Sequence, residues 1–443
     1  MLNRESTQAL IKKVTSYTKH YATVIINANE QNTTRFANSE ISQNIAITDA
    51  NLTINLFDGK KEVSCTTNVL TDDGLKLVVQ NAEEMLKFVP EGEFDVFPFS
   101  KETITDITET CEKNSLSKAF GVTERANYIK EGVAQIEAGF TCAGALNLNK
   151  NILVVGDSED GFRYGSYDEL TFNTVVTHED GAAGAGECCS YVNTPDILQE
   201  FKKAQATAKL ARNPIPPELG THTVVLSPIA FADLIYYVAM SLNAKGVEDG
   251  ISFATNQLGQ KIFGENLTMV DDCYFEGLRP LYFDIQGNPR QKLSLIDKGV
   301  ISAFAYDNKT AIKKNIKSTG HAISTRFIGG AIPANVIVNQ GNQGLEDIIK
   351  DTNDGVFINE FHYNNPVNIR QLQITGLTRN GTFLIKDGKL SSPISTVRFT
   401  ENLLNAFSDI SAISNTRQLV NFGFMSLLVP AVRINKFCFT SKQ

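Results

Sequence analysis

The run His222-Thr223-Val224-Val225-Leu226-Ser227-Pro228, followed by the apolar stretch from Ile229 to Leu242, decides the expected fold of the second half of this chain. The first run is short and apolar, which is typical of a buried strand. The second run is apolar almost all round, which is typical of a helix enclosed in a core. We therefore expect a β-rich second domain with this helix inside it.

Length and composition limit the architecture. A chain of 443 residues is too long for one ordinary core, so we expect two domains, residues 1–204 and 205–443. Hydrophobic residues make up 42% and charged residues 20%, as in soluble globular proteins. The net charge of -8 argues against a dominant nucleic-acid role, because phosphate contacts need a concentrated positive field.

The N-terminus and the cysteines predict the compartment. Residues 1–6 lack the apolar core of a signal peptide. No stretch approaches the roughly 20 apolar residues that a bilayer-spanning helix needs. The 7 cysteines are odd in number and scattered, which favours reduced thiols over a disulfide framework. We therefore expect a cytoplasmic protein that does not contact a membrane.

Periodicity predicts an α+β first half, with helices packed on a mixed sheet. Asp58-Gly59 predicts the turn of a β-hairpin. Gly181 to Gly186 is predicted to be a glycine-alanine loop, with a mobile flap as one role. Helical spacing covers residues 5–21, 75–89, 115–138 and 196–212, and strand-like patterns cover residues 22–26, 52–56, 151–155 and 170–176.

Proline and glycine mark the predicted boundaries and turns. Asn213 to Gly220 holds three prolines within four positions. Prolines stiffen a connection and exclude regular structure, so we place the domain break there or slightly before. In the second half, Asn380-Gly381 and Asp387-Gly388 each lie between apolar runs and predict tight turns.

Several short motifs follow one another in the order seen in a known family. Together, their order and spacing resemble the TldD/PmbA family, whose active members are zinc peptidases, and the similarity covers most of the chain. The motifs are Arg35-Phe36-Ala37-Asn38, Val225-Leu226-Ser227-Pro228, Asp271-Asp272, Phe283-Asp284 with Gly287, Ile296-Asp297-Lys298-Gly299-Val300 and Ser318-Thr319-Gly320.

The helix after the strand lacks the zinc motif of that family. Active members carry His-Glu-x-x-x-His there, with two histidines that bind zinc and a glutamate that accepts the proton of water. The aligned positions in this sequence are Tyr236, Tyr237 and Ser241, and these side chains are poor zinc ligands. The chain therefore resembles the PmbA (TldE-like) branch. We expect it to have no catalytic residue and no metal ion of its own.

Two other family segments also differ. The Asn-Pro-Val-Thr-Gly-Asp segment of the family appears here as Asn365-Pro366-Val367-Asn368-Ile369-Arg370, without the glycine and the aspartate. The usual cysteine ligand region has no match around Ser408 to Gln418. Both differences fit a divergent member and argue against independent catalysis.

The resemblance implies a partner and a substrate. A TldD-like peptidase subunit would form a cytoplasmic dimer with this chain and supply both the zinc and the general base. This chain would shape the substrate channel and stabilise the dimer. The implied reaction is proteolysis of unfolded or modified peptides, as in peptide maturation. The older family label, modulator of DNA gyrase, has no support in these residues.

Two alternatives from other functional classes stay open. His178-Glu179-Asp180 is the only histidine-carboxylate cluster in the sequence and could bind a metal in a hydrolase with a different site, although a polar loop end also explains it. The second alternative is a homodimeric protein that captures extended peptides at a sheet edge without cleaving them. Asp271-Asp272 and Cys188-Cys189 are expected to be loop residues without a catalytic role.

Overall fold

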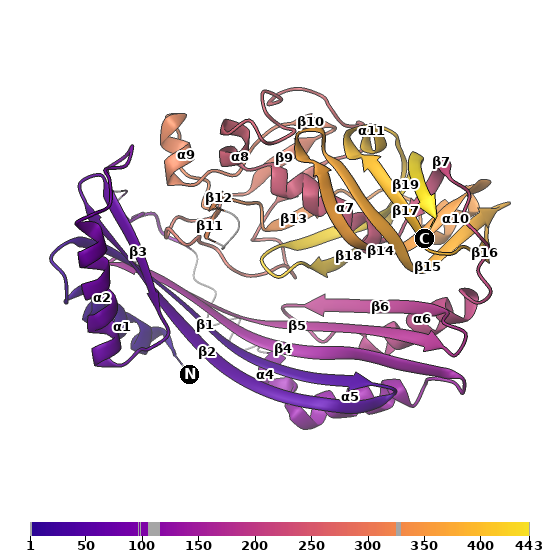
Figure 1. Cartoon of the computed structure of the whole chain (residues 1–443), viewed down its shortest axis with the longest axis horizontal. Helices are drawn as coiled ribbons and strands as arrows, with labels where there is room; N and C mark the ends of the chain where they lie inside the picture. The colour runs from indigo at the N-terminus through magenta and orange to yellow at the C-terminus, as the bar shows by residue number, and fades with distance from the viewer. Residues whose placement is uncertain (1, 96, 98, 105–115, 325–328, 443) are drawn as a thin grey trace.

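In the computed structural model, which describes residues 2–95, 97, 99–104, 116–324 and 329–442, a long curved sheet from the first half runs beneath the second half (Figure 1). Among these described residues, the first sheet has 6 strands in the order β3-β2-β1-β4-β5-β6. The second half builds an 11-stranded sheet from described residues. The predicted α+β class, with a sheet and helices in each half, is confirmed.

The first half combines long strands with short helices. The predicted helices are confirmed within the described residues, and so is the hairpin at Asp58-Gly59. The first helix ends at Thr15 and not at residue 21, and the stretch 115–138 holds two helices, with residue 115 outside the described residues. The helices are α1 (Arg4–Thr15), α2 (Asp72–Leu86), α4 (Leu116–Ala119), α5 (Val122–Val133) and α6 (Ile197–Leu210). The strands are β1 (Tyr21–Ala37), β2 (Glu40–Asp58), β3 (Lys61–Thr67), β4 (Phe140–Asp157), β5 (Phe162–His178) and β6 (Ala183–Ser190).

The described helices of the first half cover the outer face of this sheet. Side chains alternate between the two faces of a strand, and Leu52 and Leu56 of β2 pack in one outer cluster with residues of α1 and α2. Phe172 of β5 packs with Phe201 of α6 in a second outer cluster, at a ring distance of 5.1 Å. The inner, concave face of the sheet therefore faces the second half of the chain (Figure 1).

The second half is strand-rich. None of its described helices, nor any described helix of the first half, is long and apolar enough to cross a membrane. The helices are α7 (Pro228–Ser241), α8 (Ala244–Glu248), α9 (Asn308–Lys313), α10 (Leu345–Lys350), η1 (Ile369–Gln371) and α11 (Leu403–Ser408). The strands are β7 (Gly220–Leu226), β8 (Met269–Asp271), β9 (Leu293–Asp297), β10 (Val300–Ile301), β11 (Ala322–Ser324), β12 (Gly329–Ala331), β13 (Asn335–Val338), β14 (Asp354–Asn368), β15 (Gln373–Lys386), β16 (Lys389–Pro393), β17 (Val397–Asn402), β18 (Ile410–Asn421) and β19 (Ser426–Lys442).

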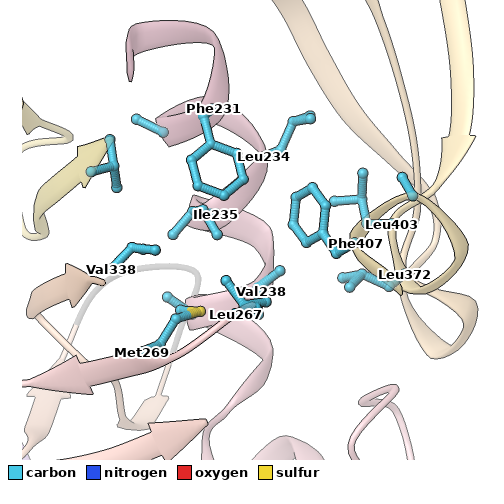
Figure 2. Packing of buried hydrophobic residues seen from close by; sticks show 14 of the residues in the cluster. Phe231, Leu234, Ile235, Val238, Leu267, Met269, Val338, Leu372, Leu403 and Phe407 are labelled. Carbon is cyan, nitrogen blue, oxygen red and sulfur yellow. The ribbon is translucent and has the colours of Figure 1, made fainter. Parts of the chain in front are cut away.

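Helix α7 lies in the core of the second half, as predicted. Ser227 caps it, because its side-chain oxygen accepts a hydrogen bond from the backbone N–H of Ala230 at 3.2 Å. Phe231 and Leu234 are fully buried. The ring of Phe231 meets the ring of Phe407 from α11 edge-on at 5.4 Å (Figure 2).

The mixed pairing that we predicted for the first sheet occurs in the second sheet instead. Each adjacent pair of strands in the first sheet is antiparallel, because most of these strands follow one another through short turns. In the second sheet, β13 runs parallel to β19 and β7 runs parallel to β14. Long connections that include helices separate both of these pairs in sequence.

The predicted glycine-alanine loop is wrong, because most of it forms strand β6. Gly184 and Gly186 allow α6 to pack closely on this strand. A Cβ atom at these two positions would lie 2.2 Å from the carbonyl oxygen of Ala204 and 2.4 Å from that of Glu200. The small residues therefore serve close packing of a helix on a strand and not a mobile flap.

One of the two predicted turns is also wrong. Asn380-Gly381 lies inside β15 as a β-bulge, where the register shifts between Ile358 and Glu360 of β14. The φ angles of 49° and 119° at these two residues suit asparagine and glycine. Asp387-Gly388 does form the predicted turn, between β15 and β16.

The proline-rich segment connects the two halves. Helix α6 ends at Leu210 on the first sheet, and β7 begins the second sheet at Gly220. The prolines lie between these two points. The exact boundary, at residues 204 and 205, stays a prediction.

Candidate functional site

A cavity of about 880 Å³ lies between the concave face of the first sheet and loops of the second half. Asn27 of β1 and Asn55 of β2 line it from the sheet, and Arg279, Phe283 and His321 line it from the other side. Its volume falls in the range of about 300 to 1,000 Å³ that is usual for ligand pockets. The cavity can therefore hold a small molecule or part of a peptide.

A buried charge network forms part of the cavity wall and extends behind it. One oxygen of Asp271, Oδ2, accepts hydrogen bonds from the backbone N–H groups of Ala334 at 2.5 Å and Asn335 at 2.8 Å. The other oxygen, Oδ1, lies 3.1 Å from His321 Nε2 and 3.6 Å from Arg290 Nη2. The network fixes β8, β13 and the segment before β11 relative to one another.

The histidine of this network has no ring nitrogen left for catalysis. His321 Nδ1 lies 2.8 Å from the carbonyl oxygen of Thr319, and Nε2 faces the carboxylate of Asp271. Both ring nitrogens are therefore held by oxygen atoms of neighbouring residues. Burial alone would raise the pKa of Asp271, but the positive charges of His321 and Arg290 outweigh it and hold that pKa well below its usual range. The arrangement stabilises the fold and does not form a general base.

A second buried arginine joins the two halves of the chain. Arg279 Nη1 donates to the carbonyl oxygen of Phe424 at 2.8 Å. Its guanidinium lies over the rings of Tyr167 and Tyr191 at 5.8 and 5.7 Å, and its Nη2 lies 3.8 Å from Glu169. Tyr167, Tyr191 and Glu169 all belong to the first half. The contacts of Arg279 therefore hold β5 and the end of β6 against the second half.

Tyr236, Tyr237 and Ser241 lie on the last turns of α7 and contact neighbouring residues. The hydroxyl of Tyr237 donates to the carbonyl oxygen of Asn364 at 2.7 Å, and that of Ser241 donates to the carbonyl oxygen of Tyr237 at 2.8 Å. The ring of Tyr236 lies 5.0 Å from that of Phe422. Burial raises the pKa of Tyr237 to about 12. These side chains fill space and satisfy backbone carbonyls.

An acidic cluster near α7 was not predicted from the sequence. It joins Glu187 of β6, Asp233 of α7 and Glu360 of β14. Burial, strengthened by neighbouring carboxyl groups, raises the pKa of Asp233 to about 8 and those of Glu187 and Glu360 to about 7. One signal was available, since Asp233 is the only charged residue on an otherwise apolar helix.

This cluster predicts that stability falls as the pH rises. A carboxyl group in the unfolded chain has a pKa near 4, so between about pH 4 and pH 8 the folded chain holds protons that the unfolded chain has released. The free energy of unfolding must then decrease with rising pH in this window. We expect a lower melting temperature at pH 9 than at pH 6, and a smaller decrease for Asp233→Asn.

The control for this experiment is Asp73→Asn, which changes an exposed carboxylate on α2. This variant should keep the pH dependence of the parent chain. If Asp233→Asn behaves like Asp73→Asn, the cluster does not cause the dependence.

Comparison with known proteins identifies the family. Residues 219–441 match the model of the PmbA/TldA metallopeptidase C-terminal domain. This chain belongs to the PmbA/TldD family. It is 25% identical over 408 residues to a metalloprotease TldD homolog of Buchnera aphidicola, covering 85% of this chain and 82% of that relative. It is 24% identical over 312 residues to the metalloprotease PmbA of Escherichia coli O157:H7, covering 66% and 64% of the two chains.

A solved structure shows the shared fold over the whole chain. TldE from Thermococcus kodakarensis superposes with a TM-score of 0.84 at 19% identity, covering 98% of this chain and 100% of that one. The likeness therefore extends to the first half, which lies outside the matched family model.

Zinc does not fit the corresponding helix of this PmbA/TldD-family chain. Helix α7 contains no histidine and no glutamate. Tyr236, Tyr237 and Ser241, which are predicted from the sequence to stand at the zinc-motif positions, offer two phenols and a hydroxyl. The hydroxyls of Tyr237 and Ser241 already donate to carbonyl oxygens. Within the described part of the chain, no group of three or more His, Cys, Asp or Glu side chains is arranged to hold a metal ion.

The alternative cluster lies at the turn between β5 and β6. His178 Nδ1 is 2.9 Å from Asp180 Oδ1, and Asp180 Oδ2 is 2.8 Å from Arg212 Nε. The Arg212 guanidinium lowers the pKa of Asp180 to about 2, with help from the backbone N–H of Ala182. Glu179 is exposed. The structure brings His178 and Asp180 together, but Arg212 occupies the carboxylate that a metal would need.

The paired cysteines point to opposite faces of β6. Cys188 packs in the outer cluster with Phe172, while Cys189 Sγ lies 3.3 Å from the carbonyl oxygen of Leu419 on the inner side. Burial raises the pKa of both thiols. Both are free cysteines, buried enough to stay protonated.

Proposed function

We propose that this chain is a PmbA/TldE-like subunit of a TldD-type metallopeptidase that acts on unfolded or modified peptides. In this proposal the chain contributes to the dimer and to the substrate channel, and a TldD-like subunit contributes the zinc and the general base. The observation that carries the proposal is helix α7, where Tyr236, Tyr237 and Ser241 stand at the aligned zinc-motif positions and make packing or hydrogen-bond contacts of their own. We place the complex in the cytoplasm.

Other features support a role in substrate binding. The cavity is large enough for several residues of a peptide. It lies between the two halves of the chain, where pockets for ligands often form. The names of the relatives, metalloprotease TldD homolog and metalloprotease PmbA, support a link to peptide hydrolysis.

Affinity capture tests the proposed assembly. A tagged copy of the chain, expressed in its native host, should co-purify with one other protein in equal amount. That protein should contain His-Glu-x-x-x-His and cleave unstructured peptides when both chains are present. If the chain returns only a second copy of itself, the proposal is wrong and a homodimeric peptide-binding protein becomes the better explanation.

Metal content gives a second test. The purified chain, incubated with zinc and dialysed, should retain less than about 0.1 zinc ion per chain, because tyrosine and serine hydroxyls bind zinc poorly. The captured complex should retain about one zinc ion. Elemental analysis by mass spectrometry measures both values.

A hydrolase with its own site would give a different result. Peptide cleavage by the chain alone that is lost on adding a chelator, and is also lost in His178→Ala, would favour the cluster at the turn between β5 and β6. The same experiment with Tyr236→Phe serves as the control, because this residue lies on α7 and outside that turn.

A further inference from the structure

The concave face of the first sheet carries rows of uncharged amide and hydroxyl side chains beside the cavity. Antiparallel pairing places Asn29, Gln31 and Thr33 of β1 directly opposite Asn151, Asn149 and Asn147 of β4. Residues directly opposite each other in such a pair project to the same face. The next pair along the strands, Asn27 and Leu153, lines the cavity, so these six side chains, the amide rows, continue the cavity wall along the sheet.

Hydrogen bonds between neighbouring strands order the amide rows. Asn29 Nδ2 donates to Asn151 Oδ1 at 2.8 Å, and Thr33 Oγ1 donates to Asn147 Oδ1 at 2.8 Å. Asn149 Nδ2 donates to Glu169 Oε1 at 3.3 Å, and the Oδ1 atom of Asn149 has no partner among the described residues. An amide group has two donor hydrogens and an acceptor oxygen with two lone pairs. Gln31 Nε2 donates to Thr33 Oγ1 at 3.3 Å, and Asn147 Nδ2 donates to Thr171 Oγ1 at 3.1 Å. The Oδ1 atom of Asn149 is buried, so the hydrogen-bonding capacity open to a ligand lies on the exposed Gln31 and the half-buried Asn29 and Asn151.

The chemistry of the amide rows matches a peptide main chain. A peptide group offers one N–H donor and one C=O acceptor, and a side-chain amide can bond to both. The six side chains carry no charge of their own, while Asp49 of β2 lies opposite Asn29 on the same face and Glu169 bonds to Asn149. From Asn27 to Thr33, β1 extends about 20 Å, which is the length of roughly six residues of an extended peptide.

We propose that the amide rows bind the main chain of an extended peptide largely independently of its side chains. This inference rests on the proposed function, since it explains how the wall of the channel would hold many different unfolded peptides. The amide rows would hold the peptide in an extended conformation next to the cavity, and the cavity would bind one end of that peptide.

Fluorescence anisotropy with the full chain tests this proposal. The probe is a fluorescein-labelled peptide of 12 residues made of alanine, serine and glycine, and the comparison probe carries N-methyl groups on alternate peptide nitrogens. N-methylation removes main-chain donors and keeps the side chains. We expect the unmodified probe to bind at least about tenfold more tightly, with an affinity that changes less than about twofold between low and high salt.

Two variants and one control locate the binding surface. The triple variant Asn147→Leu, Asn149→Leu and Asn151→Leu keeps side-chain size and should weaken binding at least about tenfold. Gln31→Leu, which changes an exposed residue and leaves the fold intact, should weaken it about threefold. Asn44→Leu makes the same amide-to-leucine change at an exposed site on the opposite face of β2 and should bind like the parent chain.

Several results would overturn the inference. The inference is wrong if the parent chain binds neither probe, if it binds both probes equally, or if Gln31→Leu binds like the parent chain. It is also wrong if maltohexaose displaces the probe, because that result would indicate a carbohydrate-binding surface. Affinity capture separates this outcome from failure of the proposed function. If the chain captures a TldD-like subunit but does not bind the peptide, only the proposal for the amide rows is wrong. If it binds the peptide but captures no such subunit, only the proposed assembly is wrong.

Discussion

Replacing Asp271 by asparagine should reduce the free energy of unfolding of the second half by about 3 to 5 kcal/mol. Asp271 is fully buried, and its carboxylate is the acceptor that faces both His321 and Arg290. An asparagine has no charge, so the buried guanidinium of Arg290 would lose its counter-charge and His321 would lose a charged hydrogen-bond partner. Removing one partner of a buried ionic network costs far more than the network contributes as a whole.

The adjacent residue gives a matched control. Asp272 pairs with the exposed Lys292 at 2.9 Å, and its Oδ1 accepts from the backbone N–H of Tyr274. Asp272→Asn keeps that acceptor and loses one ion pair, which solvent screens because its lysine is exposed, so it should cost only about 1 kcal/mol. Hydrogen exchange on peptides that contain β8 and β13 measures the opening free energy of this region. Similar losses for the two variants would show that the network does not stabilise the fold.

Phe407→Ala should cost a comparable amount, about 3 to 5 kcal/mol. Phe407 is completely buried, and its ring faces that of Phe231 (Figure 2) at a distance of 5.4 Å. The ring of Phe263 lies 6.3 Å from it. The shortened side chain would leave a cavity between α7 and α11 that neighbouring rings cannot fill. The loss should appear in the hydrogen exchange of α7.

Phe88→Ala is the control for this substitution. The side chain of Phe88 is 84% exposed, so its removal should change stability by no more than about 0.5 kcal/mol. Phe407→Leu should lose an amount of stability between those of Phe407→Ala and Phe88→Ala, because leucine keeps most of the buried volume. A loss at Phe407 no larger than that at Phe88 would contradict the central place of α7 in the core.

The elements that were predicted correctly are those whose signal is local. Helix α7 follows from a long apolar run, and the hairpin between β2 and β3 follows from two turn residues between alternating strands. Strand β6 was missed because the role of Gly184 and Gly186 depends on α6, which begins after the strand and folds back onto it. A glycine that permits close packing and a glycine in a flexible loop look the same in a sequence.

The candidate site depends on contacts between residues far apart in the sequence, and no local sequence pattern shows such contacts. The sequence identified the aspartate pair at residues 271 and 272, but it did not indicate that His321 would lie against Asp271. Glu187, Asp233 and Glu360 come from three separate elements, and each alone is an ordinary charged residue. The amide rows alternate with buried residues on β1 and β4, so they resemble the solvent face of any sheet until the cavity is placed next to them.

Strand β19 has a consequence for how the chain is made. It pairs with β13, β17, β18 and β7, so it lies between strands that are all synthesised before it, β7 and β13 long before. On the ribosome, the first sheet can close once β6 has emerged, since its strands precede that point. The second sheet lacks its central strand until β19 appears, and during this interval the apolar surface around α7 is not fully covered. Nascent chains stalled before β19 should therefore recruit chaperones that bind apolar segments, and chains stalled before β7 should not.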